Sequence, residues 1–422
     1  MTNKSSMQSI PMPSVPPTLE GQSAELAHRF TTVRAHTLSL AQPLSDEDQC
    51  VQSMPDASPT KWHLAHTSWF FETVVLQAFQ PGYQAFDPQY LYLFNSYYEA
   101  LGPRHPRPQR GLLTRPALAD IHAYRQHVNA AILRFVAATD DSNWQAAVSL
   151  IELGLHHEEQ HQELIQTDVL HLLSCNPMLP PYQPSSGVWP ADHASSLQWL
   201  GVDGGIYAVG HAGDGFAFDN ETPQHRALLH PFYIANRLVT CGEFLDFIAD
   251  GGYTHAQWWL SDGWSAVQAQ GLTAPAYWLA PGDPRAPSKQ WQVFSLNGVR
   301  PLDRQAPVNH VSFFEAAAFA EWCGARLPTE FEWEVAFDVA QITQMLGQGW
   351  QWTRSSYDPY PGFRPRTGAA REYNGKFMVG QQILRGASPA TPMGHRRKTY
   401  RNFFPPAARW QFSGIRLAKD HI

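Results

Sequence analysis

The sequence predicts an α+β protein in which a four-helix bundle precedes an irregular domain of short strands, long loops and few helices. Apolar residues recur at helical spacing through the first 175 residues or so. From Trp199 onward, short apolar runs are broken by Gly, Pro, Asn and Asp, which is typical of short strands and loops. With 422 residues, the chain is long enough to bury a core in each domain.

The bundle prediction comes from spacing within the first part of the chain. Leu26, Phe30 and Val33 lie at positions i, i+4 and i+7, which places them on one face of a helix. Residues 81–116 are Pro-rich and too many for a tight turn, so one long crossover connects two of the helices. The expected helices are 23–42, 60–80, 116–139 and 142–174, after a flexible tail over residues 1–22.

A change of composition indicates where the bundle ends. The stretch CNPMLPPYQPSSGVWP, residues 175–190, carries five prolines and cannot continue a helix. We expect the bundle to cover residues 23–178, a Pro-rich linker 179–198 and the second domain 199–422. Within the second domain, good helical patterns occur over residues 241–250 and 312–323.

Composition excludes several classes of protein. Aromatic residues make up 13% and charged residues 16% of the chain, which is typical of a folded protein. A net charge of −7 argues against a nucleic-acid partner. The four cysteines are far apart, and no stretch has the apolar length of a signal peptide or a membrane helix. We therefore expect a cytoplasmic protein with no membrane partner; the oligomeric state cannot be predicted.

Paired histidines give the strongest chemical signal. In LGLHHEEQHQELIQTD, His157 and His161 are four residues apart, so both imidazoles lie on one face of a helix and can hold one metal ion. A third ligand is available in SPTKWHLAHTSWFFE, where we favour His66 and expect His63 to be an outer or surface residue. Three neutral imidazoles leave positions open for substrate and suit Zn, Fe, Cu or Ni alike.

The same segment matches H-E-x-x-H, the pattern of zinc hydrolases, in which Glu158 would be the general base. The extended form of that pattern needs a ligand six residues after the second histidine. Here that position is Thr167, and residues 164–200 contain no Glu. The hydrolase is therefore a distant alternative.

Five segments in order carry a resemblance to a known family. They are WHLAHTSWFFE, LFNSYYEALGPRHPRPQRGLLTRP, HHEEQHQEL, GARLPTEFEWEVA and TYRNFFPPAARWQFSGIRLA. From about residue 25 to 418, the chain resembles the ergothioneine-biosynthetic sulfoxide synthases and the closely related selenoneine synthases. The resemblance implies a DinB-like four-helix bundle and a domain of the formylglycine-generating-enzyme (C-type-lectin-like) type. It also implies a mononuclear non-haem Fe(II) held by His66, His157 and His161.

The resemblance implies an oxidation that uses O2. Its members join a sulfur donor, cysteine or γ-glutamylcysteine, to C2 of the imidazole ring of hercynine and give a sulfoxide. The selenium branch joins a selenosugar instead and gives a selenoether. Sequence alone does not choose between these donors.

The family's substrate-binding residues map onto two sets of positions. A quaternary ammonium group is bound by aromatic faces and oxygen atoms, since it has no hydrogen to donate. The hercynine set is Gln160, Asn402, Phe403 and Phe404. The donor set is Arg107 and Arg110, whose guanidinium groups match a carboxylate.

A phenol near the metal could supply a proton that directs the reaction toward the sulfur product. Our candidates are Tyr97 and Tyr98 in NSYYEA, with Tyr357, Tyr360 and Tyr373 as reserves.

The sequence departs from the family pattern at two places, and two other functions compete with the one that the resemblance implies. The usual Gly-Gly-Ser is Gly386-Ala387-Ser388 here, and the usual G-N-V-W-E-W-T is GQGWQWT over residues 347–353. Cys323 is the last cysteine, so the late cysteine pair of formylglycine generation is missing. A non-catalytic betaine-binding module is the other alternative, but structural metal sites are usually closed by four protein ligands.

Overall fold

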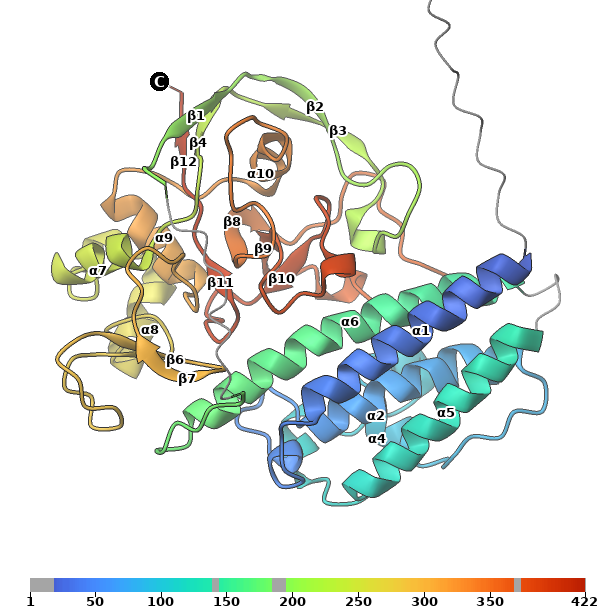
Figure 1. Cartoon of the computed structure of the whole chain (residues 1–422). Coiled ribbons are helices and arrows are strands. Elements are labelled where there is room, and N and C mark those ends of the chain that lie inside the picture. The colour runs from blue at the N-terminus through green and yellow to red at the C-terminus, as the bar shows by residue number, and fades with distance from the viewer. Residues whose placement is uncertain (1–18, 139–143, 184–194, 368–372, 422) are drawn as a thin grey trace, which may run out of the picture.

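The computed structural model describes residues 19–138, 144–183, 195–367 and 373–421. A helical bundle is followed by a domain of small sheets, short helices and loops, which confirms the predicted α+β class. Figure 1 shows the longest helix, α6, running along the boundary between the two parts. Among the described residues, no helix combines the length and apolar character needed to cross a lipid bilayer.

The described helices confirm the four long segments expected in the bundle and extend one of them. Helix α1 begins at Leu19, so residues 19–22 are helical rather than part of a tail; residues 1–18 and most of the predicted linker, 184–194, lie outside the described residues. The helices are α1 (Leu19–Ala41), α2 (Thr60–Phe70), α3 (Gln77–Phe79), α4 (Tyr90–Phe94), α5 (Leu118–Ala138), α6 (Trp144–Ser174), α7 (Cys241–Ala249), α8 (Ser261–Gln270), α9 (Phe313–Trp322) and α10 (Glu330–Ala336).

The second helix of the bundle is not uniform. A π-helical turn, Phe71–Leu76, joins α2 to α3, so the segment expected at 60–80 is one continuous rod with a local change of winding. Within that turn, Glu72 accepts hydrogen bonds from the hydroxyls of Tyr83 (2.8 Å) and Tyr124 (2.6 Å). These bonds tie the π turn to the crossover and to α5, and π turns often occur next to functional sites.

Among the described residues of the second domain, short strands form four small sheets. The sheet orders are β1-β4-β12, β10-β9-β8-β11, β5-β6-β7 and the hairpin β2-β3. Asn402 of β10 lies opposite Leu384 of β9. The strands are β1 (Trp199–Val202), β2 (Gly205–Val209), β3 (His225–Leu229), β4 (Phe232–Ala235), β5 (Trp278–Leu279), β6 (Gln292–Ser295), β7 (Gly298–Pro301), β8 (Trp350–Ser356), β9 (Gln382–Arg385), β10 (Asn402–Phe404), β11 (Ser413–Gly414) and β12 (Ala418–Asp420).

The expected helices of the second domain are present as α7 and α9, but α8 and α10 were not predicted. Helix α9 begins after Ser312, whose side chain accepts from the backbone N–H of Glu315 in a capping box. Helix α10 is short and begins after Thr329, whose side chain accepts from the backbone N–H of Glu332 in a capping box. Helix α8 has weak apolar periodicity, which explains why the sequence did not reveal it.

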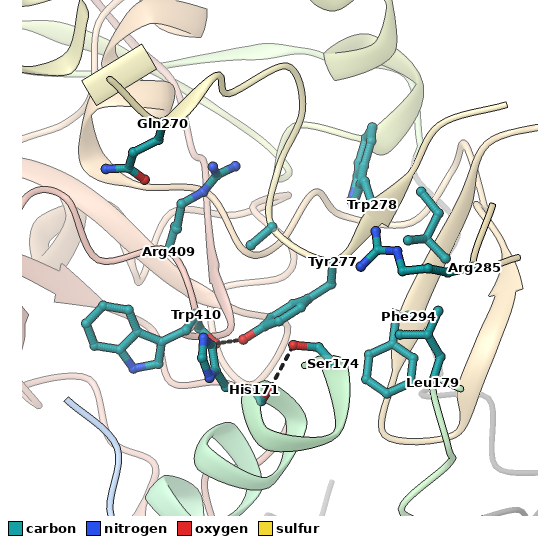
Figure 2. Close-up of a pocket in the computed structure, with 12 residues that line it drawn as sticks. His171, Ser174, Leu179, Gln270, Tyr277, Trp278, Arg285, Phe294, Arg409 and Trp410 are labelled. Carbon is teal, nitrogen blue, oxygen red and sulfur yellow. Dashed lines mark hydrogen bonds between the residues drawn. The ribbon is translucent and has the colours of Figure 1, made fainter. Parts of the chain in front are cut away.

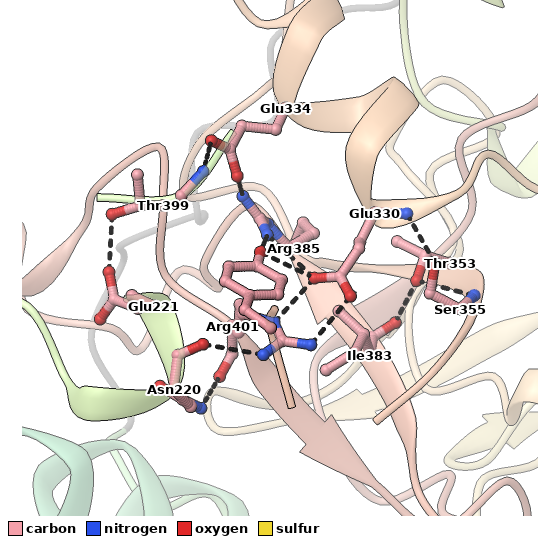
Figure 3. Close-up of polar contacts among 12 residues, drawn as sticks. Asn220, Glu221, Glu330, Glu334, Thr353, Ser355, Ile383, Arg385, Thr399 and Arg401 are labelled. Carbon is pink, nitrogen blue, oxygen red and sulfur yellow. Dashed lines mark hydrogen bonds and ion pairs between the residues drawn. The ribbon is translucent and has the colours of Figure 1, made fainter. Parts of the chain in front are cut away.

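Buried ion pairs attach α10 to the end of β9 and to the start of β10 (Figure 3). Glu330 accepts from the guanidinium of Arg401 at 2.8 and 2.9 Å and from Arg385 at 3.2 Å, and Glu334 also pairs with Arg385. All four side chains are buried. Arg401 directly precedes Asn402, so this network fixes the start of β10.

A buried carboxylate connects the two domains. Glu163 of α6 accepts hydrogen bonds from Trp350 Nε1 (2.7 Å), Ser388 Oγ (2.5 Å) and Thr391 Oγ1 (2.7 Å). Burial raises the pKa of Glu163, although these three donors act in the opposite direction. The contact fixes α6 against β8 and the loop after β9.

The crossing of α2 and α6 requires a glycine. A Cβ at Gly154 would lie 2.6 Å from Cε1 of Phe71 and 3.0 Å from Cδ1 of Phe70, and both rings are fully buried. The missing side chain therefore lets the two helices that carry the histidines approach each other.

We predict that Gly154→Ala destabilises the fold by about 1–3 kcal/mol, because the added methyl overpacks this crossing. Intrinsic helix propensity alone predicts the opposite, a gain of about 1 kcal/mol. The control is Ala146→Gly at an exposed position of α6, which should cost about 1 kcal/mol. Chemical denaturation measures both, and a stabilised Gly154→Ala protein would contradict the tight crossing.

Candidate metal centre

Three buried histidines from two helices converge on one point. His66 of α2 and His157 and His161 of α6 place one ligand nitrogen each within 4.8 Å of the others. The Nε2 atom of His157 lies 3.1 Å from Nε2 of His66 and 3.1 Å from Nε2 of His161. The i, i+4 spacing in α6 and the close approach of α2 produce this arrangement.

Hydrogen bonds at Nδ1, the ring nitrogen that points away from the cluster, determine the tautomers of His66 and His161. Nδ1 of His66 lies 2.6 Å from the carbonyl oxygen of Phe94 and must donate to it, which leaves a lone pair on Nε2. Nδ1 of His161 lies 2.8 Å from Nδ1 of His63, whose Nε2 lies 3.0 Å from the Asp168 carboxylate. His63 is therefore a partner of a candidate ligand, one step away from the cluster.

The three nitrogens fit a metal ion. Burial and the neighbouring histidines lower the pKa of His66 and His161 well below the usual value, and burial lowers that of His157 to about 3, so all three are neutral ligands. Nitrogen ligands at about 2.1 Å from a metal and at right angles to each other are about 3 Å apart. Lone pairs that face each other at 3.1 Å are stabilised by a cation between them.

A second buried cluster resembles a metal site but does not fit one. His156, Glu159 and His395 also bring three ligand atoms together. However, Arg29 donates to Nε2 of His156 at 2.7 Å, so the proton of the neutral ring is on Nδ1, which lies 2.9 Å from Nδ1 of His395 and 2.9 Å from the Glu159 carboxylate. The cluster is a hydrogen-bonded link between α6 and the second domain.

Glu158, the general base of the hydrolase alternative, points away from the three histidines. Its carboxylate accepts from Arg34 (2.9 Å), Thr37 (2.6 Å) and Arg125, and it is fully buried. Burial alone would raise its pKa, but Arg125 and Arg34 outweigh burial and lower it to about 2. A carboxylate occupied by two arginines is not available to activate a metal-bound water, which argues against zinc hydrolysis.

The candidate tyrosines differ in their surroundings. Tyr97 accepts from Arg107 at 3.0 Å and packs edge-on against Phe377, while Tyr98 is buried against Trp69. Tyr373, considered only as a reserve, makes a T-shaped contact with His157 at 5.8 Å between ring centroids.

Tyr357 and Tyr360 are reserves that the structure places elsewhere. The hydroxyl of Tyr357 accepts from Asn220 at 2.9 Å, and that of Tyr360 donates to Glu330 at 3.2 Å. Both phenols are therefore engaged within the second domain. Among the described residues, Tyr373 is the only one of the five candidate tyrosines whose ring contacts one of the three histidines.

Gln160 and Phe403, two of the residues expected to bind the acceptor, each contact tyrosines of the second domain. Gln160 accepts from the hydroxyl of Tyr373 and donates to the hydroxyl of Tyr400 at 2.7 Å. Phe403 stacks on Tyr357, with ring centroids 4.1 Å apart.

The other two expected acceptor residues also lie on β10. Asn402 uses its amide oxygen to accept from the next backbone N–H, at 2.9 Å. Phe404 packs against Trp410 at 6.4 Å between centroids. We call the stacked rings of Phe403 and Tyr357 the aromatic wall. Phe404 packs against Trp410 and is not part of this wall.

The two expected donor-side arginines are held differently. Arg110 is 4% exposed, its guanidinium lies 3.4 Å from the centroid of the Trp62 ring, and NH1 donates to Ser58 at 2.9 Å. Its Nε and NH2 have no hydrogen-bond partner among the described residues, and burial lowers its pKa to about 9. Arg107 donates to the hydroxyl of Tyr97 and to the carbonyl of Asp56, and only its Nε has no hydrogen-bond partner among the described residues.

Comparison with known proteins identifies the family. Family models match residues 29–165, as the DinB superfamily, and 187–341, as the sulfatase-modifying factor enzyme 1-like domain. The hercynine oxygenase of Mycobacterium tuberculosis is 32% identical over 94% of this chain and 99% of that protein. The chain belongs to the hercynine oxygenase family. A hercynine oxygenase of Mycolicibacterium smegmatis is 30% identical over 94% of this chain and 98% of that protein.

Membership confirms the resemblance and both predicted domain types. A shorter match, 38% identical over 32% of this chain and 45% of that protein, is the formylglycine-generating enzyme of Streptomyces coelicolor. As a member of the hercynine oxygenase family, the chain is an oxidoreductase, and the family implies a metal-dependent oxygenase. The three convergent histidines are the described cluster that fits such a metal.

The two departures from the hercynine oxygenase pattern include buried positions of the second domain, Gln351 and Ala387. Gln351, where the family motif has Glu, accepts from Trp333 and Arg416, both at 2.7 Å, inside the core of the second domain. Ala387, where the motif has Gly, has φ 63°, in the left-handed region that favours glycine, and precedes Ser388 at the domain interface. Both positions shape packing within the second domain and against α6.

A cavity of about 340 Å³ lies at the far end of α6 and is separate from the three histidines (Figure 2). His171 of α6 and the aromatic residues Tyr277 and Trp410 of the second domain line it. The Tyr277 hydroxyl is 3.5 Å from the backbone carbonyl of Trp410. The candidate metal centre is therefore not part of this cavity.

We predict that Glu158→Gln lowers the free energy of unfolding by about 3–5 kcal/mol, because it leaves two buried arginines without their carboxylate. The matched control is Glu152→Gln on the same helix, whose partly exposed pair with Arg29 should contribute about 1 kcal/mol or less.

The pH dependence of stability gives a second readout. The folded pKa of Glu158, about 2, is below the ordinary 4.5, so its stabilisation is complete above about pH 4.5 and is lost as the pH falls toward 2. Glu158→Gln should remove this part of the acid dependence. Unchanged stability with abolished turnover would instead favour the hydrolase.

Proposed function

We propose that this protein is an Fe(II)- and O2-dependent enzyme that joins a cysteine-type thiol to C2 of the hercynine imidazole and gives a sulfoxide. The observation that carries the proposal is the set of three buried, neutral imidazoles with converging nitrogens, in a chain similar over almost its whole length to hercynine oxygenases. Three protein ligands leave positions free for substrates.

The reaction balances without a further reductant. The thiol gives up one hydrogen and the C2–H bond gives up the other; one oxygen atom stays in the sulfoxide and the second leaves as water. Iron, when bound, supplies the one-electron chemistry that lets O2 react with these closed-shell substrates. The residues around it bind and orient the two substrates and provide protons.

The acceptor is held by Gln160 and by the wall that includes Phe403. Gln160 is fixed on both sides by Tyr373 and Tyr400, so its side chain has one orientation next to the ligand His161. Phe403 stacks one face on the buried ring of Tyr357 and is itself only half-buried, so the electron-rich ring of Phe403 can contribute to binding a trimethylammonium group.

Arg110 supports a donor that carries a carboxylate. It is a buried guanidinium whose Nε and NH2 are unpartnered among the described residues, and such a cation is stabilised by an incoming anion. A cysteine-type donor brings a carboxylate, whereas a selenosugar brings hydroxyls. The unpartnered nitrogens of Arg110 therefore favour a thiol donor with a carboxylate. Selenoneine formation is the alternative.

The direct test is anaerobic loading with Fe(II), followed by air, hercynine and one donor: cysteine, γ-glutamylcysteine or 1-selenoglucose. We expect the mass of a hercynine sulfoxide with a thiol. A hercynine–selenosugar adduct would select the selenium alternative, and no hercynine adduct with any donor would contradict the proposal.

Two neighbouring histidines give the matched variants for this assay. His157→Ala should lose both bound Fe(II) and product. His156→Ala should keep bound Fe(II), because its ring belongs to the hydrogen-bonded cluster with Glu159 and His395.

A second prediction concerns the proton donor, which we place among Tyr97, Tyr98 and Tyr373. Loss of a general acid typically lowers the rate by about 10²-fold or more. The corresponding Tyr→Phe variant should therefore keep Fe(II) but form less sulfoxide or divert the thiol to simple oxidation. The ring contact of Tyr373 with His157 makes Tyr373→Phe the variant with the largest expected effect. Full activity in all three variants would exclude a tyrosine acid.

A further inference from the structure

A chain of buried hydrogen bonds leads away from one candidate ligand. Oδ2 of Asp168 lies 3.0 Å from Nε2 of His63, and Nδ1 of His63 lies 2.8 Å from Nδ1 of His161. Asp168, His63 and His161 are 7%, 2% and 8% exposed, so water does not compete effectively for these bonds.

The order of donors and acceptors in this chain is determined at its outer end. The backbone N–H of Ser58 donates to Oδ2 of Asp168 at 2.8 Å, and the carboxylate accepts from His63 through the same oxygen. Neutral His63 then carries its proton on Nε2 and accepts at Nδ1. His161 must donate from Nδ1, which leaves its lone pair on Nε2, the atom that faces the other two histidines.

The geometry of the helices explains why Asp168 reaches His161 only through His63. Asp168 is two turns after His161 on α6, about 10 Å along the axis, which is too far for a direct hydrogen bond. His63, one turn before His66 on α2, bridges the gap from the facing helix. The chain therefore connects the two helices that carry the candidate ligands.

The three candidate ligands consequently have different outer partners. His66 donates to a neutral carbonyl, and Nδ1 of His157 has no hydrogen-bond partner among the described residues. Only His161 is linked, through His63, to a carboxylate. A hydrogen bond that leads to a negative charge raises the basicity of a ligating imidazole.

We propose that Asp168 and His63 are positioning residues that hold His161 in the tautomer with the Nε2 lone pair and make it the strongest electron donor of the three ligands. This inference rests on the metal site of the proposed function but not on the identity of either substrate. It assigns to His63 a role distinct from that of a ligand.

The test compares Asp168→Asn, His63→Phe and a control. The Ser58 N–H holds an oxygen at the Oδ2 position, so the Asn variant keeps the acceptor and the tautomer and loses only the charge. His63→Phe keeps a ring but breaks both hydrogen bonds. The control is Glu163→Gln, the same carboxylate-to-amide change at a buried α6 position whose hydrogen-bond partners are Trp350, Ser388 and Thr391.

Co(II) affinity and the Fe(III)/Fe(II) reduction potential are measured without hercynine or a donor. We expect both variants to bind Co(II) 10- to 100-fold more weakly, as is typical for loss of an outer partner of a ligand, and the control to bind normally. Asp168→Asn should also raise the Fe(III)/Fe(II) reduction potential, because removal of the negative charge destabilises Fe(III) relative to Fe(II).

Each other outcome overturns a defined part of the inference. Normal Co(II) affinity and potential in both variants would overturn it entirely. Weak binding by His63→Phe together with normal affinity and potential in Asp168→Asn would overturn the role of the charge. Failure of the unchanged protein to bind Co(II) would overturn the metal site as well, whereas Co(II) binding without any hercynine product would overturn only the proposed reaction.

Discussion

The approach of α2 to α6 is the constraint on which the rest of the structure depends. Three imidazoles meet at 3.1 Å only because Gly154 lets α6 lie against Phe71 at the end of α2. The same approach brings His63 to His161. A shift of one helix past the other would separate ligands that come from different parts of the chain.

Successive residues of α6 serve different neighbours because the direction of the side chain turns by about 100° per residue. His157 and His161 face α2, while Glu158 faces inward to Arg34 of α1 and Arg125 of α5. His156, Glu159 and Glu163 face the second domain. The segment HHEEQHQE therefore contributes to the candidate metal centre, to the buried ion pairs of the bundle and to the domain interface within about two turns.

The sequence predicted the features that depend on local periodicity. The long helices, the two-part architecture and the proximity of His157 to His161 follow from spacing along the chain. The meeting of His66 with that pair depends on a tertiary crossing that spacing along the chain does not fix; the sequence favoured His66 as a ligand on the second helix, and the family resemblance implied the same residue.

Features set by long-range contacts were not accessible from the sequence in the same way. The ion pair of Glu330 with Arg401 joins α10 to the start of β10, and Tyr373 reaches His157 from a loop more than 200 residues away, whereas the capping box of α10 was a local signal that the sequence did offer. The tautomer of His161 depends on Asp168 and His63, which carry no recognisable motif. The one available signal for Asp168 was its place on the same helical stripe as His157 and His161.

The central claim is that His66, His157 and His161 hold a single metal ion through their Nε2 atoms. Diffraction from crystals loaded anaerobically with Fe(II), recorded on both sides of the iron absorption edge, tests it most directly. The account predicts one anomalous peak per chain, about 2.1 Å from each of the three nitrogens. A peak between His156, Glu159 and His395, or no peak at the three-histidine cluster, would contradict it.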